Sequence, residues 1–211
     1  MELFSYFRSS AAFRVRLALN LKGIPHTITP ISLMKGEEQS ADYLALNPQG
    51  FVPALRLDNG RVLTQSQAII EYLEETYPAK PLFAADPIVR AEQRAFAAVI
   101  ACDIHPLNNL RVLNDLEQRF GAGNEQKDLW YRHWIKEGFE VLEGLLQNHA
   151  GRFTWGDTPS LGDVFLLPQT FNALRFNVPM EAYPTIMAIY HHCLELPEIV
   201  AATPAQQVDA F

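Results

Sequence analysis

The chain has 211 residues, 48% hydrophobic and 19% charged, and 17 Lys+Arg against 24 Asp+Glu give a net charge of −7. The acidic balance argues against a binder of nucleic-acid backbones, and no apolar run approaches the ~18 residues that a membrane-spanning helix needs. The two cysteines stand apart from each other and from any Cys/His cluster, so neither a disulfide framework nor a metal is expected.

The first eighty residues alternate strand and helix signals. The N-terminus MELFSYFRSS has no basic-then-apolar leader, which favours a cytoplasmic protein, and Glu2–Phe7 is a short apolar run typical of a strand. Apolar residues then recur at every fourth position, at Phe13, Leu17 and Leu21, and Lys22-Gly23 follows. This pattern predicts a helix that ends in a left-handed cap. The elements expected next are a strand over 26–33, a hairpin over 52–63 with an Asn-Gly turn, and a helix over 66–77. This order predicts a compact α/β domain over residues 1–80.

A proline-rich linker over 78–87 separates this domain from a second part with helical patterns only. Asp86-Pro87 is typical of a helix start, and Pro106 is expected to kink or split the helix that follows. Ser160 and Asp163 have the spacing of a capping box. Further helices are expected over 126–149, 160–174 and 183–194, which gives an all-helical domain over 86–211. This domain carries the net negative charge, since residues 1–83 hold 8 basic and 8 acidic side chains and the remainder 9 and 16.

Arg8-Ser9-Ser10 lies where the first predicted strand turns into the first helix. The N-terminus of a helix presents unpaired N–H groups and the positive end of the helix dipole, which stabilise an anion. A bound thiolate would suit this place. The alternative is that Ser9 or Ser10 only caps the helix, because serine is a preferred cap residue.

Two other segments have ligand-binding potential. If the Val52-Pro53 bond is cis, the N–H and C=O of Val52 become free to pair with an extended ligand as a strand would, although proline at a strand start is also ordinary. Gln65 and Ser66 open the second helix, where the serine hydroxyl and N–H could hold a carboxylate. Plain capping by Thr64 or Ser66 is the alternative.

Together these segments resemble the zeta class of glutathione transferases. The motifs that carry the resemblance are SSxxxRVR at 9–16, LNPQ at 46–49, QSxAIIEYLE at 65–74, HPLNNL at 105–110 and RFxV at 175–178, with Ser160-x-x-Asp163 in the helical half. They are spread over nearly the whole chain, and their combination is more specific than any single motif.

The resemblance implies a thioredoxin-like N-terminal domain that binds glutathione, a helical C-terminal domain and a homodimer. Ser9, assisted by Ser10, would hydrogen-bond the glutathione sulfur, and Val52 would pair with its cysteinyl backbone. Gln65 and Ser66 would hold the γ-glutamyl carboxylate. Further contacts to glutathione are implied for Gln39, His105 and Asn109.

The implied activity is glutathione-dependent cis–trans isomerisation of maleylacetoacetate in phenylalanine and tyrosine breakdown. Thiolate addition turns the double bond into a single bond that rotates, and elimination leaves the trans isomer. A dianionic substrate requires cations, for which Arg8 and Arg175 are candidates and Arg111 a weaker one, with interdomain or surface ion pairs as the alternative. His105 could move a proton or be structural.

Alternative activities stay open. The same chemistry on maleylpyruvate is one, but that branch tends to carry an arginine where this chain has Leu110, which favours maleylacetoacetate. A general glutathione transferase or dehalogenase is another, and a non-catalytic glutathione-binding module is a third, which the retention of Ser9, Gln65 and Ser66 disfavours. Ala11 replaces a cysteine found in many eukaryotic members, so chemistry that needs that thiol is not expected.

Overall fold

The computed structural model describes residues 1–210 in two compact units. One joins Met1–Leu82 with the chain from Leu194 onward, and the other is Phe83–Cys193. The structure thus differs from the predicted helical domain over 86–211, because helix α9 (Pro197–Ala202) packs against α1 (Ser10–Lys22) of the N-terminal unit. A short 3-10 helix, η3 (Pro204–Gln206), follows α9. Phe211, the last residue of that predicted domain, lies outside the described residues.

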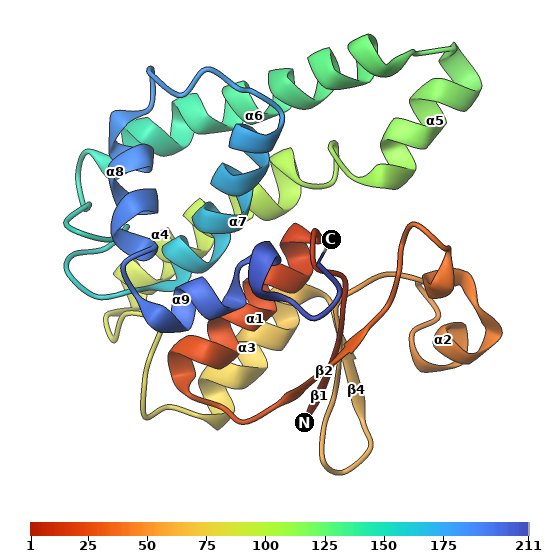
Figure 1. The fold of residues 1–211 in the computed structure, drawn as a ribbon. Helices are drawn as coiled ribbons and strands as arrows, with labels where there is room; N and C mark the ends of the chain where they lie inside the picture. Colours follow the sequence, from red (N-terminus) through yellow and green to blue (C-terminus); the bar gives the residue numbers. More distant parts are fainter. Residues whose placement is uncertain (211) are drawn as a thin grey trace. The chain divides into compact units, whose positions relative to one another are not determined.

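Within residues 1–210 the N-terminal unit holds one four-stranded sheet in the order β2-β1-β3-β4 (Figure 1). The strands are β1 (Glu2–Ser5), β2 (Thr27–Pro30), β3 (Ala54–Arg56) and β4 (Val62–Thr64). β1 and β2 are parallel because α1 forms the crossover between them, whereas β3 and β4 form the predicted hairpin. Leu3 on β1 pairs with Leu55 on β3, and both are fully buried. Helices α1 and α3 (Ser66–Thr76) pack against each other.

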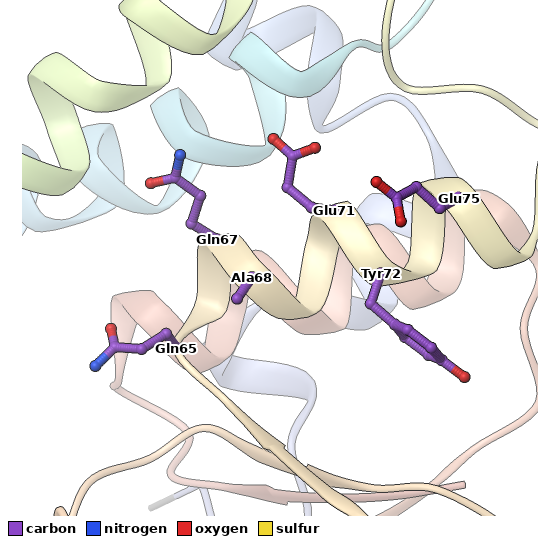
Figure 2. A pocket seen from close by; sticks show the side chains of 6 residues that line it. All are labelled: Gln65, Gln67, Ala68, Glu71, Tyr72 and Glu75. Atoms are coloured by element: carbon purple, nitrogen blue, oxygen red, sulfur yellow. The ribbon is translucent and has the colours of Figure 1, made fainter.

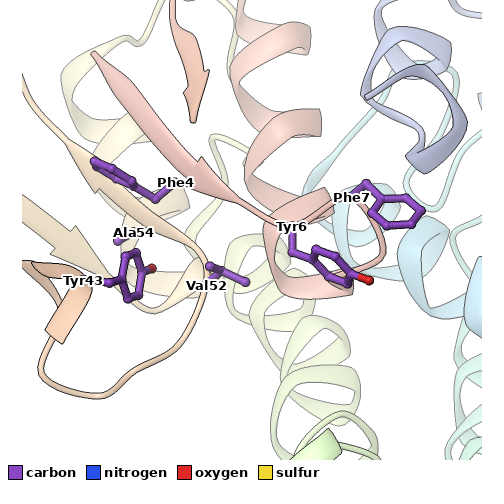
Figure 3. Packing of buried hydrophobic residues seen from close by; sticks show 6 residues of the cluster. All are labelled: Phe4, Tyr6, Phe7, Tyr43, Val52 and Ala54. Atoms are coloured by element: carbon purple, nitrogen blue, oxygen red, sulfur yellow. The ribbon is translucent and has the colours of Figure 1, made fainter. Parts of the chain in front are cut away.

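Two short elements lie between the predicted strand over 26–33 and the predicted hairpin over 52–63, where no helix or strand was expected. They are η1 (Glu37–Gln39) and α2 (Ala41–Leu46). Ser40 caps α2 by accepting a hydrogen bond from the Tyr43 N–H, and Tyr43 is the buried residue of this helix. Its ring meets Phe4 edge-on in a cluster that also contains Tyr6, Phe7, Val52 and Ala54 (Figure 3). The packing of this cluster holds α2 and the loop before β3 against the end of β1.

The second unit is helical. It contains α4 (Pro87–Ala98), η2 (Val99–Ile104), α5 (Leu110–Phe120), α6 (Asn124–Leu146), α7 (Leu161–Arg175) and α8 (Pro184–Cys193). Asp86 caps α4 as predicted, through hydrogen bonds from two main-chain N–H groups. Across residues 1–210 no helix combines the length and apolar character needed to cross a membrane.

The predicted break at Pro106 is present, but the helical geometry changes before it. η2 is a π-helix that leads into the turn at 105–109. It passes close to α6 at Gly138, where a Cβ atom would overlap the side chain of Ile104. Gly138 therefore permits the contact between η2 and α6.

The predicted capping box opens α7. Asp163 is 1% exposed, and its carboxylate accepts hydrogen bonds from the N–H and hydroxyl groups of both Ser160 and Thr154. Burial raises the pKa of Asp163, and these four bonds oppose that shift. The network fixes the start of the most deeply buried helix of the unit.

Candidate functional site

Ser9 is the N-cap of α1. Its Oγ accepts a hydrogen bond from the Ala12 N–H at 3.2 Å, and its side chain is half-buried. A hydroxyl has one donor and two acceptor lone pairs, so capping leaves the O–H proton able to donate to a ligand. The first turn of α1 contains no acidic residue that would neutralise the positive end of the helix dipole, and Ser10 is buried at its first position. The two readings of this turn are therefore compatible, because a capping serine still offers a donor.

Val52 follows a loop in which buried side chains hydrogen-bond the preceding carbonyl group. The Phe51 C=O accepts hydrogen bonds from the Tyr43 hydroxyl and the Asn47 Nδ2, each at 2.7 Å, and Asn47 is 1% exposed. The Val52–Pro53 peptide bond is cis. Within residues 1–210 the main-chain N–H and C=O of Val52 make no hydrogen bond to the protein. The loop thus presents a donor and an acceptor of the kind that pairs with an extended peptide.

Gln65 and Ser66 form the start of α3, and this start has an unusual backbone. Gln65 adopts φ 67° although it is not glycine, and α3 has no side-chain cap and no acidic residue in its first turn. A left-handed non-glycine residue costs about 1 to 3 kcal/mol and is typical of binding sites. The uncapped N–H groups at a helix start are suited to a carboxylate.

Two hydrogen bonds connect this helix start to the other segments. Gln65 Nε2 donates to Gln49 Oε1 at 3.0 Å, in the loop that leads to Val52. Arg14 on α1 is 2% exposed and donates to the Ser66 hydroxyl at 3.4 Å. The start of α3 is therefore joined to the Val52 loop on one side and to α1 on the other.

An open groove begins at Gln65 and follows α3. It is lined by Gln65, Gln67, Ala68, Glu71, Tyr72 and Glu75 (Figure 2). Figure 2 shows Gln67, Glu71 and Glu75 projecting from the same side of the helix. Two carboxylates along the groove repel an anion, so the favourable place for a negative group is the helix start rather than the groove.

Gln39 is exposed on η1 and packs over the turn before Val52. Its Nε2 donates to the Gly50 C=O at 3.3 Å, and a Cβ on Gly50 would lie 2.6 Å from that nitrogen. Gly50 has φ 62°, a backbone conformation that favours glycine. Gln39 thus lies close to the loop before Val52, and a small movement of its side chain would release its amide from the Gly50 C=O.

The arginine candidates are divided between the units. Arg8 is exposed at the β1–α1 turn, with its guanidinium 4.9 Å from the Phe7 ring centre. Arg175 ends α7, lies 4.7 Å from the Phe176 ring centre and acts on the hydroxyl of Tyr131 by lowering its pKa. Burial raises the pKa of Tyr131 to about 12 and outweighs the opposing effect of Arg175, so Tyr131 stays neutral at neutral pH.

The other candidates surround the turn after the π-helix. His105 is half-buried at its end, and Asn109 caps α5 by accepting from the Arg111 N–H at 3.1 Å. Arg111 is exposed. Asn109 therefore has a structural role that the sequence prediction did not include.

Sequence reasoning did not identify the hydrogen bonds that support the site, although Arg14 on the first helix was expected to be structural. Asn47 and Tyr43 hold the Phe51 carbonyl, and Arg14 reaches Ser66. The turn chemistry of Asn47-Pro48-Gln49-Gly50 was the signal available for the first of these. No local pattern marks a bond from one helix to the start of another.

Residues 8–76 match the family model described as glutathione S-transferase, N-terminal domain. The chain is 46% identical to a maleylacetoacetate isomerase of Pseudomonas aeruginosa, over 99% of this chain and 98% of that protein. It resembles a holo structure of maleylpyruvate isomerase, a bacterial zeta-class glutathione S-transferase, with TM-score 0.97 and 44% identity over all of both chains. A maleylacetoacetate isomerase of Methylobacterium extorquens, solved with bound malonate and glutathione, gives TM-score 0.96 and 40% identity, also over both whole chains. The chain therefore belongs to the family of zeta-class glutathione transferases and maleylacetoacetate isomerases.

Proposed function

We propose that this protein is a glutathione-dependent cis–trans isomerase that converts maleylacetoacetate to fumarylacetoacetate. The observation that carries the proposal is the set of groups in the N-terminal unit. Ser9 offers a site for a thiolate, the main-chain N–H and C=O of Val52 make no hydrogen bond within the described residues, and the helix start at Ser66 has no side-chain cap. These are the groups that a γ-glutamyl-cysteinyl peptide requires.

The residues present fit glutathione. The free N–H and C=O of Val52 would pair with the cysteinyl backbone, and the start of α3 with Gln65 and Ser66 would receive the γ-glutamyl carboxylate. Gln39 would reach the glycyl end, and His105 and Asn109 would add polar contacts. When bound, glutathione supplies the thiolate that adds reversibly to the alkene so that its carbon–carbon bond can rotate.

Ser9 lowers the pKa of that thiol by donating its O–H proton to the sulfur, and the start of α1 with Ser10 adds the field of the helix dipole. An unperturbed thiol has a pKa of about 8.5, and lowering it by about two units corresponds to ~2.7 kcal/mol of thiolate stabilisation. The thiolate is then the main form at neutral pH.

The arginines act on the substrate. Arg8 and Arg175, with Arg111 as a weaker candidate, bind the two negative charges and stabilise the charge that develops on a substrate oxygen. The malonate in the Methylobacterium extorquens relative, a small dicarboxylate, supports a dianionic ligand. His105 is the candidate for proton transfer at the substrate.

The choice of maleylacetoacetate over maleylpyruvate depends on Leu110. This residue begins α5 and is 55% exposed, and its apolar side chain offers no additional cation. We also propose that the enzyme works as a cytoplasmic homodimer. Sedimentation at micromolar concentration should therefore show a species of twice the 23.8 kDa chain mass.

The test follows the loss of maleylacetoacetate and of maleylpyruvate by absorbance, with and without glutathione. Each assay is coupled to the hydrolase that accepts only the trans product. A glutathione-dependent signal that is larger with maleylacetoacetate supports the proposal, and a larger signal with maleylpyruvate reassigns the substrate. If neither substrate reacts while the protein still binds glutathione, the isomerase proposal fails in favour of conjugation or dehalogenation.

A further inference from the structure

The last described residues of the chain contact the turn between β1 and α1. The Phe7 N–H donates to Asp209 Oδ2 at 3.0 Å. Ala210 packs against the hydrophobic cluster to which Phe7 belongs. Gln207 donates to two main-chain carbonyl groups, those of Ala201 and Thr203, and so holds this segment to the end of α9.

Arg16 contacts the same turn from inside the unit. It is 1% exposed on α1, and its guanidinium donates to the carbonyl groups of Tyr6 and Phe7 at 3.4 and 3.1 Å. The same side chain donates to the Ser5 hydroxyl at 3.0 Å and, through Nε, to the Ala202 C=O at 2.9 Å. One buried cation therefore joins β1, the turn and α9.

Asp209 also acts on this cation through its charge. Burial lowers the pKa of the Arg16 guanidinium to about 9, and the Asp209 carboxylate opposes that shift by favouring the charged form. A buried cation without a compensating anion is costly. Removing Asp209 would thus weaken the support for Arg16 and leave the Phe7 N–H without this acceptor.

We propose that Arg16 and Asp209 are positioning residues that hold the β1–α1 turn so that Ser9 keeps its place at the start of α1. The Ser9 N–H donates to the Tyr6 C=O at 3.0 Å, so a shift of the turn is passed directly to Ser9. A donor to a thiolate must be aligned within a few tenths of an ångström to be effective. This inference rests on the proposed function of Ser9.

The experiment compares Asp209→Ala with Asp209→Asn, which keeps an acceptor for the Phe7 N–H but loses the charge. Glu198→Gln is the matched control, because Glu198 is an exposed carboxylate on α9. For each variant the pKa of the glutathione thiol in the complex is measured by the ultraviolet absorbance of the thiolate. Glutathione affinity and thermal unfolding are measured alongside.

Asp209→Ala is expected to raise the bound thiol pKa by about 0.5 to 1 unit and to lower kcat at pH 7 about 1.5- to three-fold. Glutathione affinity should change less than about three-fold, because Val52, Gln65 and Ser66 are not touched. Asp209→Asn should recover part of the shift, and Glu198→Gln should show none. An unchanged thiol pKa in Asp209→Ala overturns the proposal, even if the protein unfolds at a lower temperature.

A ligand-free readout separates this inference from the proposed function. Hydrogen exchange at the amides of residues 7–12 should be faster in Asp209→Ala than in the wild type and in Glu198→Gln. If the wild type binds no glutathione, the proposed function fails, and exchange alone decides whether Asp209 holds the turn. Equal exchange in all three proteins means that it does not.

Discussion

Replacing Ser9 by alanine removes one hydroxyl with two uses, and the two losses can be separated. As the N-cap of α1, its Oγ accepts from the Ala12 N–H, and losing such a cap costs about 1 kcal/mol of stability. As a donor to the thiolate it makes a hydrogen bond to a charged group, worth about 1.5 to 3 kcal/mol. At 1.36 kcal/mol per pKa unit, the bound thiol pKa should rise by about one to two units.

The rate should follow the thiolate fraction. If the wild-type complex has a thiol pKa of about 6.5, roughly three quarters of it is thiolate at pH 7, and the variant retains between about a quarter and 3%. This predicts a three- to twenty-five-fold lower turnover at pH 7. The variant should regain activity as the pH rises through its higher thiol pKa. The wild-type complex should gain little over the same range, because most of its bound thiol is already ionised.

The assay is the pH profile of glutathione-dependent turnover together with the thiolate absorbance of the complex. Ser40→Ala is the matched control, since Ser40 caps α2 through the same type of bond to the Tyr43 N–H. It should lose stability without a change in thiol pKa. A Ser9→Ala profile that is lowered equally at every pH, with an unchanged thiol pKa, would refute the donor role and leave Ser9 as a cap only.

Gly138→Ala should destabilise the protein by about 1 to 3 kcal/mol in thermal unfolding, because the added Cβ overlaps a buried side chain of η2. Gly144→Ala on the same helix is the control: its Cβ meets no atom within 4 Å, and it should stabilise the protein by up to about 1 kcal/mol. Similar effects of the two substitutions would contradict the packing argument. Arg175→Ala should raise KM for the dianionic substrate about ten-fold with unchanged glutathione affinity in steady-state kinetics and calorimetry, and equal losses of both would indicate a structural role. A thiol reagent should label Cys102, which is exposed, and spare Cys193, whose pKa is raised by burial; two equally fast reactions would be inconsistent with the fold.

Features set by neighbouring residues were predictable from the sequence. The cap at Ser9, the Asp86-Pro87 start of α4 and the capping box at Ser160 each depend on a side chain and N–H groups two or three residues away. The hairpin between β3 and β4 likewise depends on its own Asn-Gly turn. In each case the signal and the structure occupy the same few residues.

Features set by distant contacts were not predictable. The π-helix η2 contacts α6 at Gly138, which lies far along the chain, so no local pattern marks this contact. The positive φ of Gln65 occurs at a residue other than glycine, so the sequence gives no signal for it. α9 is a short helix without a side-chain cap, and its packing against α1 holds it in place. The ligand roles of Ser9, Val52 and Gln65 came from the family resemblance, and they remain predictions until a ligand is measured.

The division of the N-terminal unit has a consequence for synthesis on the ribosome. Residues 1–82 emerge first, but α9 and the segment after it follow only once the whole helical unit has been made. Until then Arg16 lacks the carbonyl group of Ala202 and the carboxylate of Asp209, and one face of α1 lacks its cover. We expect the nascent N-terminal segment to stay loosely packed and accessible to chaperones until α9 and Asp209 have also emerged.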